Sequence, residues 1–210
     1  MSTMLHKDKK IVFLHFPKTA GWSMDPFLRS CGFTIVDPHV NGGHMGAFYF
    51  DETFHKFGFM RHPVDWYISM YNFLNGLNWE ISNVLTGVTT PFNAAKRDSL
   101  DEFITASRKH EGMHFDLYME YILFFAIGRP RECKMVFQME NMWDHLRMIM
   151  NSFNIKYDEN YIQNNKDIKI NHSQVKDTKI SRKNLEYIFD SCNPIFKRFK
   201  YKKQNKYDTK

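Results

Sequence analysis

The residues best suited to chemistry lie at 16–23 (FPKTAGWS), directly after an apolar run at 11–14. An apolar strand, a short loop and a helix in this order can cradle phosphate, because loop N–H groups point inward and the helix adds its positive dipole end. The loop departs from the usual G-x-x-x-x-G-K-[ST] pattern, since Lys18 precedes Gly21 and Trp22 takes the place of the lysine. This displacement restricts the kind of phosphate chemistry that we expect.

A second anion-binding pattern begins at Arg61, which follows a predicted strand at 54–60. His62 and Pro63 come next, and Ser69 lies eight residues after Arg61 inside a predicted helix. The planar guanidinium fork of arginine suits phosphate. Ligands of parallel sheets bind at the carboxyl ends of the strands, where Lys18 and Arg61 both emerge. Two such groups on neighbouring strand ends imply a ligand with two separated phosphates.

On these two motifs the chain resembles the sulfotransferases that use 3′-phosphoadenosine-5′-phosphosulfate (PAPS). It is most similar to the carbohydrate group that includes heparan-type 2-O and 6-O sulfotransferases. Their 5′-phosphosulfate loop reads roughly P-K-[TV]-[AG]-[GS]-[TS]-[ST], which residues 17–23 match apart from Trp22. Their 3′-phosphate motif reads roughly [FV]-x-[FV]-[VL]-R-[DH]-P-x-x-x-x-x-S-x-[YF], and residues 57–71 follow it at the same spacing.

This resemblance implies PAPS as co-substrate and a P-loop-like, three-layer α/β fold with a central parallel β-sheet flanked by helices. The alternation of strands and helices along the chain predicts the same parallel sheet with helices on both faces. The residues implied in binding the 5′ end are Lys18, Thr19, Ala20, Gly21, Trp22 and Ser23. Arg61 and Ser69 are implied in binding the 3′-phosphate.

The relatives also carry a Gly/His segment between the two motifs, whose histidine serves as the catalytic base. Gly43 and His44 lie in that interval, so we expect His44 to deprotonate an acceptor hydroxyl. The histidines that compete for this role are His15, His39 and His62. Lys18 would stabilise the charge that develops on the bridging oxygen. Because a sulfuryl group carries less negative charge than a terminal phosphoryl group, we expect no requirement for a metal.

The pattern of apolar residues predicts strands at 10–15, 33–36, 54–60 and 135–139. Helices are predicted at 22–31, 63–74, 99–109, 116–127, 142–150, 181–191 and 194–201. Residues 75–97 fit either a lid or acceptor-binding segment or a disordered surface loop, and the polar residues 154–179 show no clear period. We expect one domain over residues 1–210, ending in a basic tail at 197–210.

Composition places the chain among packed globular proteins, since 43% of its 210 residues are hydrophobic and 16% are aromatic. The net charge of +6 resides in residues 197–210, which hold seven Lys or Arg and one Asp. We therefore expect no nucleic-acid surface, while weak contact of the tail with an anionic surface stays open.

Three scattered cysteines indicate buried thiols in a reducing compartment. No signal-peptide pattern and no membrane-spanning run is visible, so we expect a cytoplasmic protein.

Two other functions compete with the sulfotransferase. A Mg²⁺-dependent P-loop-type small-molecule kinase would bind ATP, but the position of Lys18 disfavours it. A polyanion-binding module would lose its activity when residues 197–210 are deleted, whereas an enzyme should keep its nucleotide site. The expected acceptor is a hydroxyl compound, and we favour a carbohydrate. The sequence does not identify the individual acceptor or the oligomeric state.

Overall fold

The computed structural model describes residues 3–36, 46–76, 99–108, 133–166 and 178–203. The chain divides into two compact units. The first comprises residues 1–61 and 122–172, and the second comprises residues 62–121 and 173–210. The predicted single domain stays a prediction, and the two units are described separately below.

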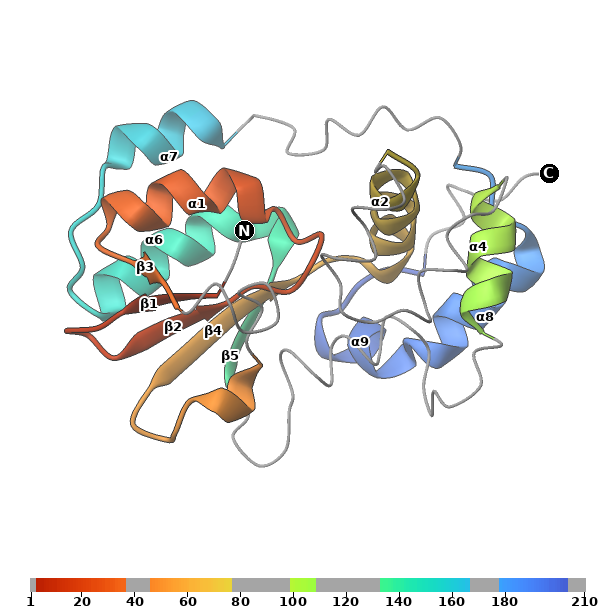
Figure 1. The fold of residues 1–210 in the computed structure, drawn as a ribbon. Coiled ribbons are helices and arrows are strands. Elements are labelled where there is room, and N and C mark those ends of the chain that lie inside the picture. Colours follow the sequence, from red (N-terminus) through yellow and green to blue (C-terminus); the bar gives the residue numbers. More distant parts are fainter. Residues whose placement is uncertain (1–2, 37–45, 77–98, 109–132, 167–177, 204–210) are drawn as a thin grey trace. The chain divides into compact units, whose positions relative to one another are not determined.

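The first unit contains a five-stranded sheet with the strand order β3-β1-β2-β4-β5 (Figure 1). The strands are β1 (Met4–His6), β2 (Ile11–Leu14), β3 (Thr34–Ile35), β4 (His55–Met60) and β5 (Met135–Gln138). Three of them, β2, β4 and β5, are parallel, and β1 is antiparallel to both β2 and β3. The sheet is therefore mixed.

The prediction of a wholly parallel sheet is thus wrong at one edge. β1 was not predicted, because three residues next to a run of charges give no readable period. β1 is joined to β2 by a tight turn, in which the N–H of Lys10 donates to the carbonyl of Lys7 at 3.1 Å. Two strands joined by so short a turn can pair only antiparallel. The parallel pairing of β2, β4 and β5 is as predicted. Both predicted anion-binding motifs follow strands of this part of the sheet.

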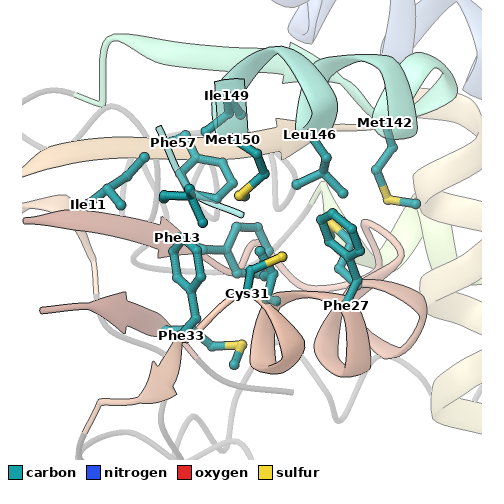
Figure 2. Packing of buried hydrophobic residues seen from close by; sticks show 14 of the residues in the cluster. Ile11, Phe13, Phe27, Cys31, Phe33, Phe57, Met142, Leu146, Ile149 and Met150 are labelled. Carbon is teal, nitrogen blue, oxygen red and sulfur yellow. The ribbon is translucent and has the colours of Figure 1, made fainter. Parts of the chain in front are cut away.

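Helices cover one face of this sheet. They are α1 (Gly21–Ser30), α6 (Met142–Ser152) and α7 (Glu159–Asn165), with the short 3₁₀ turns η2 (Ala47–Tyr49) and η4 (Met139–Asn141) in the connections. Figure 2 shows side chains from the sheet, α1 and α6 meeting in one apolar cluster, among them Phe13, Phe27 and Leu146. A second cluster on the opposite face contains Val12 and Leu14. Burial on both faces explains why β2 is an uninterrupted apolar run.

Helix α7 was not predicted, because its residues are mostly polar. Its first turn is capped by Asp158, whose carboxylate accepts from the N–H of Asn160 at 2.9 Å. Only Ile162 is buried within the helix. An ion pair of 2.7 Å joins Glu159 to Arg147 of α6. Tertiary contacts of this kind are invisible to a periodicity search.

The described part of the second unit is helical. It consists of α2 (Pro63–Gly76), α4 (Leu100–Ser107), α8 (Arg182–Ser191) and α9 (Asn193–Arg198). The rings of Tyr67 and Tyr71 on α2 contact Phe103 on α4. These helices confirm the predicted ones to within a few residues. The predicted helix at 116–127 and most of the predicted loop at 75–97 lie outside the described residues.

A polar network fixes α4 against the start of α8. The carboxylate of Asp101 accepts from the N–H of Ser181 at 2.7 Å and from the side-chain amide of Asn184 at 2.6 Å. Burial alone would raise the pKa of Asp101, but these hydrogen bonds outweigh it and hold the pKa below its usual 3.8. The ionised carboxylate therefore stabilises the fold.

We predict that this contribution is lost in acid. It is fully present above the unfolded pKa of 3.8 and disappears as pH falls below that value through the lower folded pKa. Urea unfolding of the wild type and of Asp101→Asn at neutral and acidic pH measures it. The variant should be less stable at neutral pH and should lose less stability in acid. The matched control is Asp190→Asn, at an exposed position on α8, and equal pH dependence of wild type and Asp101→Asn would contradict the prediction.

Candidate functional site

The loop between β2 and α1 has an unusual backbone conformation. Lys18 and Ala20 both adopt left-handed conformations, with φ of 67° and 60°. Non-glycine residues rarely take this conformation, and it is often found at ligand-binding turns. The hydroxyl of Thr19 donates to the carbonyl of Phe16 at 2.6 Å and so closes the loop from within. The predicted loop residue Thr19 thus has a structural hydrogen bond, and its side chain is fully buried.

Helix α1 begins directly after this loop. Ala20 is its N-cap residue and offers no side-chain cap, and the first turn contains no acidic residue. The positive end of the helix therefore carries no negative side chain of its own. The backbone of Gly21, Trp22 and Ser23 forms this first turn, so the helix begins one residue before the predicted start at 22. The N–H of Ser23 is bonded to the carbonyl of Ala20 at 3.0 Å.

Arg61 lies beside this loop, at the end of β4. Pairing of β2 with β4 sets Leu14 opposite Gly58, so both chains leave the sheet at the same edge. A side chain at Gly58 would come within 3.1 Å of the Leu14 carbonyl, which explains the glycine. Nη1 of Arg61 donates to the carbonyl of Lys18 at 3.4 Å, and Arg61 is only 6% exposed. The two predicted cationic residues are therefore neighbours.

The surroundings of Lys18 lower the pKa of its amine. Burial, and secondly the positive charge of Arg61, lower the pKa of the Lys18 amine from 10.5 to about 8. In the folded protein the charged amine is thus less favourable than in the unfolded chain, so Lys18 opposes folding at neutral pH. The negative charge of a bound anion would offset both the desolvation and the repulsion, so this pair of cations is a candidate anion site.

The other predicted site residues are distributed as follows. Ser69 lies on α2 of the second unit and is 5% exposed. His44 and the rival His39 lie outside the described residues, as does the side chain of Trp22. His15 follows β2 directly, is buried, and its ring lies 6.1 Å from that of Phe13. The structure therefore unites Lys18 and Arg61, while the roles of Ser69 and His44 stay predictions.

His62 has a contact that the sequence did not predict. Its Nε2 lies 3.0 Å from the carbonyl of Lys202, and its ring contacts those of Phe196 and Tyr201. Residues up to 203 thus belong to the fold, although 197–210 were expected to form a basic tail. The aromatic residues spaced among the lysines were the available signal. A deletion that is meant to test only the charge of the tail should begin after residue 203.

Other features of the described residues add little chemistry. All three cysteines are buried thiols outside any disulfide, as expected. Within the described ranges, no group of three or more His, Cys, Asp or Glu side chains is placed to hold a metal ion. None of the helices seen there is both long enough and apolar enough to cross a membrane. The indole of Trp66 is fully buried against Tyr67.

A scan against protein-family models, a search of curated proteins and a search of solved structures each found no match for this chain. The geometry of the site therefore carries the functional argument.

We predict that Lys18 titrates near pH 8 in the ligand-free protein. In Arg61→Gln the pKa should rise above 8 but stay below 10.5, because burial is the larger cause of the shift. NMR of ¹³C-methylated lysines over pH 6–11, with Lys18→Arg to assign the resonance, measures both values. A Lys18 pKa near 10.5 in the wild type would contradict the structure of this loop.

Proposed function

We propose that this protein is a sulfotransferase that moves a sulfuryl group from PAPS to an acceptor hydroxyl, with a carbohydrate as the favoured acceptor. The observation that carries the proposal is the contact of Arg61 with the loop of Lys18 at one edge of a parallel sheet. Two buried or half-buried cations from different strands suit a ligand with two phosphate groups. PAPS has a phosphosulfate on its 5′ oxygen and a phosphate on its 3′ oxygen.

In this proposal the loop binds the 5′ end. The backbone of residues 18–22 at the uncapped start of α1 would provide N–H donors, and Ser23 would add a half-buried hydroxyl. PAPS supplies an activated sulfuryl group whose transfer leaves negative charge on the bridging oxygen. Protonated Lys18 stabilises that charge as it develops. Approach of an anion favours the charged form of Lys18, which lets a lysine with a pKa of about 8 act as a cation.

Arg61 and Ser69 bind the 3′-phosphate in this proposal. The guanidinium is already held by the carbonyl of Lys18, so little side-chain entropy is lost when it binds an anion. Ser69 would add a hydroxyl donor from α2. A nucleotide with both phosphates would thus be favoured over one that lacks the 3′-phosphate.

The acceptor hydroxyl must lose its proton, and His44 is the proposed base. A neutral imidazole accepts the proton while the acceptor oxygen attacks sulfur in line with the departing phosphate. Among the rivals, His62 donates from Nε2 to the carbonyl of Lys202, since a carbonyl can only accept, so Nδ1 is the nitrogen of His62 that could take up a proton. His15 stays a rival.

We predict that 3′-phosphoadenosine-5′-phosphate (PAP) binds this protein more tightly than ADP, with or without Mg²⁺. Isothermal titration measures both affinities. Replacing Lys18 or Arg61 by Ala should weaken PAP binding by about tenfold or more, the loss of one hydrogen bond to a charged group. Lys7→Ala, at an exposed position of the β1–β2 turn, is the matched control. Absent PAP binding, or Mg²⁺-dependent preference for ADP, would overturn the proposal.

We also predict that His44→Ala binds PAP like the wild type but transfers sulfate at least about a hundredfold more slowly, as expected for loss of a general base. Transfer of ³⁵S from labelled PAPS to a panel of glycans, steroids and phenols measures the rate and identifies the acceptor. The matched variant is His15→Ala. If His15→Ala is the slow variant and His44→Ala is not, then the base has been misassigned while the proposed reaction stands.

A further inference from the structure

His62 lies in the second motif, at the start of the second unit. It is the residue after Arg61, and its carbonyl accepts from the N–H of Trp66 at 2.9 Å, which is the first backbone hydrogen bond of α2. The main chain of His62 therefore begins the helix that carries Ser69. Its side chain is 9% exposed and turns to the C-terminal segment instead. One residue thus connects the start of α2 to the last described residues of the chain.

The C-terminal segment contacts this side chain through the turn that follows α9. Lys200, two residues after the end of α9, is left-handed, with φ of 52°. The N–H of Tyr201 returns to the carbonyl of Phe196 at 3.1 Å, and that of Lys200 returns to Lys197 at 3.4 Å. This pair of bonds is a Schellman motif, which brings the residues at its two ends together. We call Phe196, Tyr201 and the Lys202 carbonyl the His62 socket.

Three groups of the socket contact the imidazole of His62. Its ring centroid is 5.2 Å from each of the rings of Phe196 and Tyr201, and both pairs are edge-to-face. Its Nε2 donates to the Lys202 carbonyl at 3.0 Å. Phe196 is itself anchored on Phe189 of α8 by an edge-to-face contact at 5.5 Å. The socket therefore belongs to the helical packing of the second unit and is more than a loose end of chain.

We propose that His62 is a positioning residue for the 3′-phosphate, and that the socket formed by Phe196, Tyr201 and the Lys202 carbonyl fixes it. This inference rests on the proposed function. A side chain held in one rotamer restricts the backbone of its own residue and the peptide bond that it shares with Arg61. The same restriction sets the start of α2 and thus the place of Ser69 along the helix. Ser69, the ligand that α2 is proposed to supply, is therefore ordered before the nucleotide binds.

The test compares PAP with AMP, which lacks the 3′-phosphate. Full-length wild type, His62→Ala, His62→Gln and His62→Phe are titrated with both nucleotides by calorimetry. His62→Ala and His62→Phe should weaken PAP binding by about tenfold, the effect expected when one charged hydrogen bond is lost. AMP binding should change by less than about twofold, since its contacts lie in the loop of Lys18. Gln offers an amide donor to the Lys202 carbonyl, so His62→Gln should recover most of the PAP affinity.

Tyr201→Ala tests the socket without a change at His62. It should reproduce the selective loss of PAP affinity. Tyr187→Ala is the matched control, because Tyr187 contacts Arg108 in the same unit at 3.8 Å and takes no part in the socket. Thermal melts of each variant, run alongside, separate loss of fold from loss of selectivity.

The outcomes are distinct. A fall in PAP affinity with AMP affinity kept, in His62→Ala and Tyr201→Ala but not Tyr187→Ala, supports the inference. Equal losses for both nucleotides, or no loss in any variant, overturn it while leaving the proposed function standing. Failure of the wild type to bind PAP overturns the proposed function and this inference with it.

Discussion

The site depends on the parallel pairing of β2 with β4. Because Leu14 lies opposite Gly58, both chains leave the sheet at one edge and the Lys18 loop receives the Arg61 guanidinium. Lys18 is partly buried in this loop and lies close to the like charge of Arg61, and both effects lower the pKa of Lys18. The rest of the first unit stabilises the fold against this repulsion. Apolar clusters on both faces of the sheet fix the strands whose ends carry the cations.

The loop shows how local structure serves the same arrangement. Two non-glycine residues, Lys18 and Ala20, are held in left-handed conformations, and the hydroxyl of Thr19 is bonded inside the loop. Such strain persists only where the surroundings determine the backbone strongly. Here the buried strand before the loop and the helix after it do so. In the proposed complex, a nucleotide with two phosphate groups would offset the repulsion between the two cations with its negative charge.

Several of these features were predictable from the sequence. The strand, loop and helix at 10–31 follow from an apolar run next to small and polar residues, and Pro63 marks the start of α2. Other features were not. β1 and α7 are short or polar, and their stability comes from pairing and ion pairs with distant segments. The role of His62 depends on a hydrogen bond to Lys202, 140 residues away, which no local pattern encodes.

The sequence by itself determined the residue types and spacings of the two motifs, because hydrophobic period, turn residues and helix starts are local properties. It also indicated that the ends of the strands at 10–15 and 54–60 would lie together. Only the tertiary structure decided that the sheet is mixed, that Arg61 contacts the Lys18 carbonyl, and that residues up to 203 fold onto His62. Each of these depends on which distant segments meet. That choice is made by packing and charge over the whole chain, which a reading of neighbouring residues does not contain.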